Sequence, residues 1–216
     1  MACILAIDTA GPEVGVAVSV DGKVSQWSAR VKRGAESALG EALSELLKDV
    51  PSLDGVVVSV GPGSFTSLRV GVATALGFAL ASDCKVLPIC SLRARALGKS
   101  GRVFAMLDGR KGRAYAALFV DGEPQSEAVD LAPEEAISQV QESSFVAVGE
   151  GASVWSELVL AAGGTVGQEP TASPVAQMVA LFERHQSEAV APEGVRLRYL
   201  RAPDAKLPKD SPARGS

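Results

Sequence analysis

CILAIDTAGPEVGVAVSVDG, residues 3–22, is the stretch of sequence that decides the fold. Its first six residues have the alternating apolar character of a β-strand and end at Asp8, and a second alternating run covers Val14–Val20. The Asp-Gly pair at positions 21 and 22 is a typical two-residue hairpin turn, with a third strand expected toward Trp27. The stretch therefore predicts an antiparallel hairpin whose first strand ends in an acidic residue.

The same pattern returns one hundred residues further along the chain. VFAMLD ends at Asp108, Ala114–Val120 alternates again, and Asp121-Gly122 repeats the turn. Strand, terminal Asp, strand and turn thus recur in the same order and spacing. This recurrence indicates a duplicated β-hairpin unit that opens each of two lobes.

Helical patterns alternate with short apolar runs after each hairpin unit, which is typical of an α/β protein. The Gly98–Gly101 break gives the boundary, so we expect an N-terminal lobe of residues 1–100 and a C-terminal lobe of residues 101–202. The polar, Pro-bearing residues 203–216 are expected to form a flexible tail. Helices are expected over residues 35–47, 67–81, 91–97, 133–141, 151–161 and 174–188.

Composition excludes several classes of function. Lys and Arg total 21 against 25 Asp and Glu, and this net charge of −4 gives no global positive field that would attract nucleic acid. Aromatic residues are only 5% of the chain, so base-stacking surfaces are few. His185 is the single histidine, which excludes a HEXXH metalloprotease and any multi-His metal site. We therefore expect no metal site, and an RNA contact that is local or made through a partner.

The cysteines and the apolar runs bear on where the protein works. Cys3, Cys84 and Cys90 have no C-x-x-C spacing, and with no signal peptide in view they are typical of reduced thiols that fill apolar space. Val70–Ala81, the longest nearly apolar run, is too short and too rich in Gly to span a bilayer. We expect a cytoplasmic protein that does not enter a membrane.

GPGSFTSLRVG, residues 61–71, follows an apolar run and begins a helix. Such a glycine loop presents free backbone amides at a helix N-terminus, where an anion is favoured. It is not a Walker loop, because no Lys follows at the required spacing. The alternative reading is a helix cap in which Ser64 or Thr66 satisfies the first amides. The small residues Gly71 and Ala75 further along would let another helix approach closely.

Together with ILAIDTA at the start, ALGFALA, Ser91-Leu92, LDGRKGRAYAALF and the terminal RYLR, this loop resembles the bacterial TsaB (YeaZ) family over nearly the whole chain. The resemblance implies a two-lobed actin-like ATPase fold, of the ASKHA and ribonuclease H-like class. It also implies a scaffold needed for threonylcarbamoyl modification (t6A) of the adenosine 3′ of the anticodon in tRNA. Members bind the catalytic paralogue TsaD and assemble further with the ATPase TsaE, so tRNA is contacted indirectly.

The resemblance also implies where a nucleotide cleft would lie. In this superfamily an Asp at the end of each lobe's first strand faces the cleft, and a glycine loop of the second lobe holds the adenosine. The corresponding residues here are expected to form a vestigial nucleotide cleft, without catalytic residues: Asp8, Thr9, Asp108, Gly149 and Gly151. In the alternative interpretation, Asp8 and Asp108 only end their strands and accept backbone amides. We expect no cofactor of the chain's own, since the partner subunits would use ATP and Mg²⁺.

Two predicted helices, residues 35–47 and 67–81, are expected to form the partner surface. Their apolar and small residues would pack as a four-helix interface against the same helices of a paralogue, either TsaD or a second copy in a homodimer. The predicted partner-binding residues are Leu39, Leu43, Leu68, Gly71, Val72, Ala75 and Leu76.

The chain departs from the family pattern at two places. A His-Ser-Glu usual near the first helix is replaced at residues 34–37 by Gly-Ala-Glu-Ser, and the last Gly of GPGSFTGLR is Ser67. Both changes weaken any claim to chemistry of the chain's own. The alternative function is a small-molecule kinase or ATPase of the same superfamily. A general RNA-binding protein is a further alternative, because Arg110, Lys111 and Arg113 are clustered, although such a cluster is also typical of a solvated turn.

Overall fold

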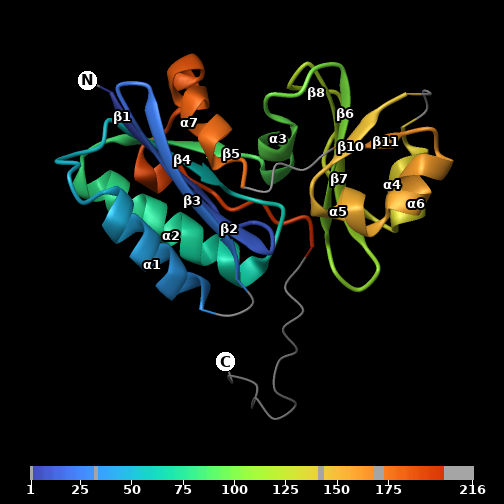
Figure 1. Cartoon of the computed structure of the whole chain (residues 1–216), viewed down its shortest axis with the longest axis horizontal. Helices are drawn as coiled ribbons and strands as arrows, with labels where there is room; N and C mark the ends of the chain where they lie inside the picture. The colour runs from blue at the N-terminus through green and yellow to red at the C-terminus, as the bar shows by residue number, and fades with distance from the viewer. Residues whose placement is uncertain (1, 32–33, 141–143, 168–172, 202–216) are drawn as a thin grey trace, which may run out of the picture.

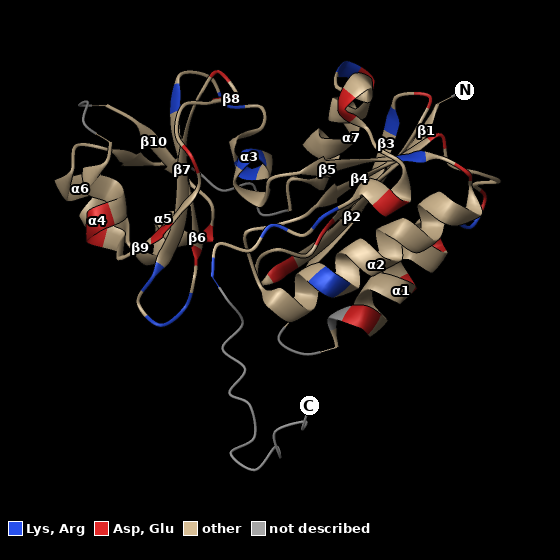
Figure 2. Cartoon of the chain, turned by 180° about the vertical axis from the view of Figure 1, so that it is seen from behind, with Lys and Arg blue, Asp and Glu red and all other residues tan. Residues whose placement is uncertain are grey.

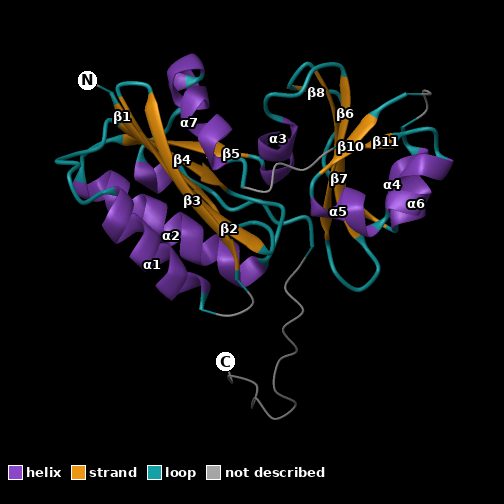
Figure 3. Ribbon diagram, in the orientation of Figure 1, coloured by secondary structure: helices purple, strands orange, loops and turns teal. Residues whose placement is uncertain are grey.

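The computed structural model describes residues 2–31, 34–140, 144–167 and 173–201. Two lobes lie side by side, each built around one β-sheet with helices on both of its faces (Figures 1 and 3). The tail predicted for residues 203–216 lies outside the described residues.

The first lobe is built on a five-stranded sheet that starts with the predicted hairpin. Its strands are β1 (Cys3–Asp8), β2 (Glu13–Val20), β3 (Lys23–Arg30), β4 (Gly55–Ser59) and β5 (Lys85–Ile89), in the order β3-β2-β1-β4-β5. β2 and β3 run antiparallel to their neighbours, whereas β1, β4 and β5 are parallel. Asp21 and Gly22 join β2 to β3 with φ values of 50° and 81°, as a type I′ turn requires.

The second lobe repeats this arrangement. Its strands are β6 (Arg102–Asp108), β7 (Ala114–Val120), β8 (Glu123–Pro124), β9 (Val129–Leu131), β10 (Val146–Val148) and β11 (Thr165–Val166). The order β8-β7-β6-β10-β11 matches that of the first sheet strand for strand, and β9 adds a further pairing with β7. Asp121 and Gly122 form the second turn with φ values of 50° and 85°. The predicted duplication is confirmed at the level of topology.

Helices cover both faces of the first sheet. They are α1 (Ala35–Leu46) and α2 (Phe65–Ala81) on one face and α7 (Val175–Arg184) on the other. The alternation of β1 serves both layers, because Leu5 and Ile7 pack toward α1 and α2 whereas Ile4 and Ala6 pack toward α7. A sheet that is apolar on both faces requires both layers of helices.

The second sheet is covered in the same way. Its helices are α4 (Pro133–Ser138), α5 (Glu150–Val154) and α6 (Ser156–Ala161) on the outer face and α3 (Ser91–Ala96) on the face toward the first lobe. On β6, Phe104 and Met106 pack toward the outer helices, and Val103 and Ala105 pack toward α3.

The structure corrects the expected division at residue 100, because α3 and α7 are exchanged between the lobes. α3, expected in the first lobe, packs against β6 and β7 through Leu92. α7, expected in the second lobe, returns to the first sheet, where the Phe182 ring fills the space above Gly55 so closely that a Cβ at Gly55 would lie 2.2 Å from it. Each helix completes an apolar core that the sheet of the other lobe provides.

Helix lengths also differ in part from those expected. α4 ends at Ser138, and the helix expected over 151–161 is divided at Trp155, whose ψ of 36° is not helical. The last predicted helix, residues 174–188, is α7 followed by a short 3-10 turn at Gln186–Glu188. Among the helices of the described ranges, none has both the length and the apolar character needed to cross a membrane.

Candidate functional site

Two pockets lie between the lobes, and they divide the residues predicted for the nucleotide cleft. The first, which we call the Asp8 pocket, has a volume of about 180 Å³ and includes Asp8, Arg95, Glu150 and Ser173 in its lining. The second, which we call the basic pocket, has a volume of about 280 Å³. Its lining is Pro62, Gly63, Ser64, Phe65, Thr66, Asp108, Gly109, Arg110, Lys111, Tyr115, Arg198, Tyr199, Leu200 and Arg201.

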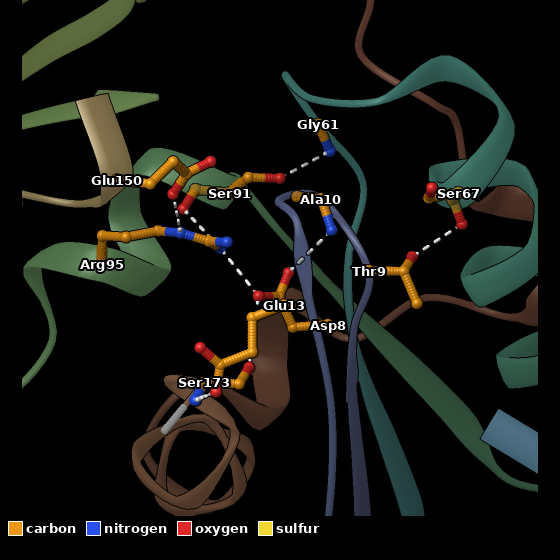
Figure 4. Close-up of polar contacts among 10 residues, drawn as sticks. All are labelled: Asp8, Thr9, Ala10, Glu13, Gly61, Ser67, Ser91, Arg95, Glu150 and Ser173. Carbon is orange, nitrogen blue, oxygen red and sulfur yellow. Dashed lines mark hydrogen bonds and ion pairs between the residues drawn. The ribbon is translucent and has the colours of Figure 1, made fainter. Parts of the chain in front are cut away.

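Asp8 ends β1 and is completely buried, yet its carboxylate has several partners (Figure 4). Arg95 Nη1 lies 2.8 Å from Oδ2, and the Ser173 hydroxyl donates to the same oxygen at 3.3 Å. The backbone N–H of Ala10 donates to Oδ1 at 3.3 Å. The buried charge of Asp8 is therefore compensated within the protein, chiefly by the guanidinium of Arg95.

Arg95 links the two lobes at this point. It extends from α3, and its Nε lies 4.0 Å from Glu150 Oε2 at the start of α5, while its Nη1 contacts Asp8 of the first sheet. Gly11 passes so close that a Cβ there would lie 2.9 Å from Glu150 Oε1 and 3.1 Å from Arg95 Nη2. The loop after β1 thus passes directly over the Arg95–Glu150 pair, and a side chain at Gly11 would require the ends of these two side chains to shift.

The charges that line the Asp8 pocket are balanced. The acidic residues Asp8, Glu13 and Glu150 are matched by the basic residues Arg30, Arg95 and Lys99. Glu13 is engaged as well, because its carboxylate accepts the backbone N–H of Ser173 at 3.0 Å. In the part of the chain that the structure describes, no three His, Cys, Asp or Glu side chains are grouped so that they could hold a metal ion.

Thr9 does not reach the pocket. Its side chain is buried, and its hydroxyl donates to the Ser67 carbonyl at 2.7 Å in the first turn of α2. Gly71 lies on the next turn, where a Cβ would come within 2.2 Å of Thr9 Oγ1. Thr9 therefore ties the end of β1 to α2, and Gly71 is the residue that allows this approach.

The other predicted cleft residues are separated. Asp108 is exposed and lines the basic pocket, where it accepts the Arg110 N–H at 2.8 Å. Gly149 lines the Asp8 pocket with a φ of 89°, and a Cβ there would lie 2.3 Å from the Met106 carbonyl oxygen. Gly151 is packed against Met106 as well. Of the five predicted residues, the structure brings only Asp8 and Gly149 to one pocket.

The GPGSFT loop lines the basic pocket, and its first residue contacts α3. Its Gly61 N–H donates to the Ser91 hydroxyl at 3.1 Å, and Ser91 is the first residue of α3 rather than its cap, which is Cys90. Ser64 is the N-cap residue of α2, but its hydroxyl lies 3.0 Å from that of Ser67 and makes no capping hydrogen bond to a backbone amide. The expectation that Ser64 caps the helix is therefore wrong. Its hydroxyl pairs with the hydroxyl of Ser67, the serine that replaces a glycine of the family pattern, and not with a backbone amide.

The predicted partner surface also requires correction. Six of its residues are buried in the core of their own lobe, and the seventh, Leu76, is half-buried against it. These six are Leu39, Leu43, Leu68, Gly71, Val72 and Ala75. A partner cannot reach side chains that already fill this core, so the surface available to a partner is the opposite side of the same helices.

That opposite side, which we call the outer helix face, consists of Gly40 on α1 and Ala73, Gly77 and Leu80 on α2. All four residues are exposed, Leu80 to 61%. A Cβ at Gly40 or Gly77 would have no atom within 4 Å. α2 has a single charged residue, Arg69, near one end, so the rest of the helix is free of charge (Figure 2). On α2, an uncharged face with an open glycine permits the close approach of another helix, whereas Gly40 on α1 lies near the exposed Glu36 and Glu41.

A carboxylate of β9 fixes the wall of the basic pocket. Asp130 accepts hydrogen bonds from Arg113 at 2.8 Å and from Arg201, through both of its oxygens, at 2.9 Å. Burial alone would raise the pKa of Asp130, but the hydrogen bonds from Arg201 and Arg113 hold this pKa below its ordinary value. Arg201 is thereby attached to the second lobe.

The cysteines line neither pocket. Burial, together with the carboxylate of Asp54, raises the thiol pKa of both Cys3 and Cys84. A raised pKa keeps a thiol protonated and unreactive at neutral pH. Both are therefore placed as fillers of apolar space.

Sequence reasoning missed Arg95, Glu150 and Ser173. Ser173 lies far from Asp8 in the sequence and no local pattern marks it, whereas Glu150 stands between Gly149 and Gly151 in the glycine loop that was predicted to line the cleft. For Arg95 a signal exists, because it lies three positions after the buried Leu92 and so on the same face of a short helix. A charged residue on a buried face requires a partner of opposite charge.

Comparisons with known proteins agree with one another. A sequence model of the TsaD family, described as tRNA N6-adenosine threonylcarbamoyltransferase, matches residues 29–165. The tRNA threonylcarbamoyladenosine biosynthesis protein TsaB of Escherichia coli is 31% identical over an alignment of 172 residues, and the match covers 72% of this chain and 74% of that protein. The protein of the same name from Haemophilus influenzae is 27% identical, over 71% of this chain and 74% of its own.

A solved structure shows the same fold. YeaZ from Pseudomonas aeruginosa superposes with a TM-score of 0.73 at 23% sequence identity. The match covers 93% of this chain and 100% of that chain. The two sheets, the helices on their faces and the exchange of α3 and α7 thus belong to a two-lobed actin-like architecture.

Proposed function

Because the chain belongs to the TsaB (YeaZ) family, we propose that it is a non-catalytic subunit of the machinery that makes threonylcarbamoyladenosine in tRNA. In this role it binds a TsaD-type paralogue in the cytoplasm, and a TsaE-type ATPase joins the resulting complex. The threonylcarbamoyl transfer and the use of ATP and Mg²⁺ then belong to the partner subunits. The names of the related proteins support the pathway, and two features of this chain support the role within it.

The first feature, which carries the proposal, is the outer helix face. α1 and α2 have already buried their own apolar sides, yet α2 leaves Leu80 61% exposed beside the open positions Ala73 and Gly77. A helix that packs across such a face can approach closely at Ala73 and Gly77, which carry little or no side chain, and can contact the exposed Leu80. A paralogue of the same fold offers an equivalent pair of helices, so the two pairs would form a four-helix interface. A second copy of this chain would use the same face, and homodimer and heterodimer would compete.

The second feature is the state of Asp8. A carboxylate that positions Mg²⁺ and phosphate must be free to do so. Here Asp8 is buried against Arg95, and a metal-nucleotide would have to displace that guanidinium from a charge pair that lies beneath a glycine loop. Removing one partner of such a buried pair typically costs about 3–5 kcal/mol. The volume of about 180 Å³ is also below the ~300–1,000 Å³ of typical ligand sites. Both facts disfavour the alternative of a kinase or ATPase.

The experiment is a reconstitution with purified TsaD-type and TsaE-type proteins and an unmodified tRNA transcript. We expect the modification to require this chain, and we expect a stable complex with the TsaD-type protein on size exclusion with light scattering. Gly77→Leu, which adds a bulky side chain to the outer helix face, should disrupt that complex. Ala161→Leu serves as the control, since it places the same side chain at an exposed helix position of the other lobe and should leave the complex intact.

The chain alone should not hydrolyse ATP. Asp8→Asn keeps the size of the side chain and removes its charge, so it separates a contaminating ATPase from activity of the chain itself. Turnover that this substitution abolishes in a variant that circular dichroism shows to be folded would indicate that the chain is an enzyme. Modification at full rate without the chain would remove its role altogether.

A further inference from the structure

The basic pocket differs from the Asp8 pocket in its charge. Three segments far apart in sequence form it: the GPGSFT loop, the loop between β6 and β7, and residues 198–201. Arg110, Lys111, Arg198 and Arg201 line it against one acidic residue, Asp108. The chain as a whole carries a net charge of −4, and the charges of the Asp8 pocket are balanced. Figure 2 shows the loop between β6 and β7 largely blue, at one end of the second lobe's sheet.

The same pocket concentrates aromatic side chains in a chain that has few. Both tyrosines, Tyr115 and Tyr199, and one of the six phenylalanines, Phe65, line it. The rings of Phe65 and Tyr199 lie 4.9 Å apart between centroids, and the Arg69 guanidinium lies 3.8 Å from the Phe65 centroid. Arg69 Nε also donates to the Tyr199 hydroxyl at 3.2 Å. Tyr199 remains 38% exposed, so one ring of this stack is available to a further planar group.

The loop between β6 and β7 holds two of the cations in an unusual backbone conformation. Arg110 and Lys111 have φ values of 60° and 55°, in the left-handed region that favours Gly and Asn. Asp108 holds this turn by accepting the Arg110 N–H. Both side chains are exposed at the tip of the loop. A turn that uses long cations where Gly or Asn would be easier indicates that the charges serve a purpose.

Two acidic residues of the described chain lie beside the pocket. Asp130 is shared by Arg113 and Arg201, so two cations meet one carboxylate. A carboxylate oxygen of Glu127 lies 3.0 Å from Arg198 Nη2, but the Glu127 side chain is 92% exposed, and such a surface pair is weak and screened by salt. Among the described residues that line or adjoin the pocket, cations therefore outnumber carboxylates.

We propose that the basic pocket binds a single-stranded segment of RNA. Arg110, Lys111 and Arg198 would contact its phosphates, and a base would stack on the exposed Tyr199 ring. A cationic groove combined with a stacking aromatic is the arrangement by which proteins bind single strands without reading their sequence. That the natural RNA is the tRNA of the modification reaction rests on the proposed function, whereas the binding itself rests on the pocket.

The test is fluorescence anisotropy of the full-length chain with a labelled single-stranded RNA of about ten nucleotides, measured over a series of salt concentrations. Arg110→Asn/Lys111→Asn removes two charges, and Asn is suited to the left-handed backbone. We expect it to weaken binding about tenfold at low salt and to lower the slope of log affinity against log salt by about 1.4. Lys48→Asn/Lys85→Asn, which removes two charges from exposed positions of the first lobe, is the matched control and should change neither quantity by more than about a tenth of these effects.

Stacking is tested separately. Tyr199→Ala should weaken binding about fivefold or more without changing the salt slope, and Tyr199→Phe should retain the affinity. Equal losses in the matched control and the loop variant would overturn the proposal, because general charge would then explain the binding. Competition by AMP at the same molar concentration as the oligonucleotide would also overturn it, since the pocket would then hold one nucleotide.

The complex with the TsaD-type protein provides an independent readout. Loop and Tyr199 variants should still form that complex, because the outer helix face lies elsewhere. If these variants form the complex normally and also bind RNA as tightly as the unsubstituted chain, the RNA site alone is refuted. Failure of the unsubstituted chain to bind a TsaD-type protein would instead refute the proposed function.

Discussion

Substituting Gly77 by Leu is expected to stabilise the isolated chain and to weaken its assembly with a partner. Gly77 is an interior residue of α2, and a Cβ there meets no atom within 4 Å. Glycine in a helix interior is about 0.8–1 kcal/mol less favourable than Ala, and Leu is close to Ala. We therefore expect the free energy of unfolding to rise by about 0.5–1 kcal/mol, which raises Tm by about 2 °C in a chain of this length.

Assembly should respond in the opposite direction. If another helix packs against the outer helix face, the side-chain atoms that Gly77→Leu introduces would occupy space that the partner helix needs. Overpacking of this kind costs about 1–3 kcal/mol, or roughly a 5- to 150-fold loss of affinity. Circular dichroism during thermal unfolding measures the first effect, and isothermal titration with a TsaD-type protein measures the second.

Gly71→Ala is the matched comparison on the buried side of the same helix. Its Cβ would lie 2.2 Å from Thr9 Oγ1, so the free energy of unfolding should fall by about 1 kcal/mol or more despite the better helix propensity of Ala. A loss of stability in Gly77→Leu would show that position 77 is enclosed. Unchanged affinity in a stable Gly77→Leu would place the partner surface elsewhere, and either result refutes the reasoning.

Three further predictions concern buried or partly buried ionisable groups. Arg95→Ala should lower the free energy of unfolding by about 3 kcal/mol because it leaves the Asp8 carboxylate unpaired, and adding Asp8→Asn should restore most of the loss in urea unfolding. Asp130→Asn should lower the free energy of unfolding at neutral pH. The difference from the unsubstituted chain should vanish as pH falls well below about 3.9, because the carboxylate of Asp130, whose pKa is lowered in the fold, stabilises the fold only while it is ionised. Cys3 and Cys84 should react with iodoacetamide far more slowly at pH 7 in the folded chain than in urea, because their thiol pKa values are raised in the fold. Their joint replacement by Ser should leave tRNA modification unchanged, and loss of modification in a folded variant would contradict their role as fillers.

The duplication could be predicted from the sequence because its signals are local. Alternating apolar residues and Asp-Gly turns act over a few positions, and both turns have the left-handed φ values that their residues favour. The order of the strands follows, since a chain that leaves a hairpin through a helix joins the sheet beside the first strand in parallel. Nothing local, by contrast, indicates that α3 and α7 cross to the other lobe.

The partner surface could not be predicted correctly because α2 is apolar around most of its circumference. Val72 and Ala75 face the core, and Ala73 and Leu80 face outward, yet all four are apolar. Without a polar side, the sequence pattern cannot say which side of a helix is buried. For Arg95 the difficulty is different, because its partner Asp8 lies in another lobe and far away in the sequence.

The exchange of α3 and α7 also determines when this protein can fold during synthesis. The first sheet leaves the ribosome early, but one of its faces stays uncovered until residues 175–184 have been made. Domains at the N-terminus of a chain usually fold first as the chain emerges, but here the first lobe cannot complete its fold before α7 has been synthesised. The nascent chain must carry an apolar sheet face, with Ile4 and Val57 at its centre, through most of translation. Exposed apolar surface of this kind is what chaperones bind. The folding of the first lobe therefore depends on α7, the last α-helix of the described chain.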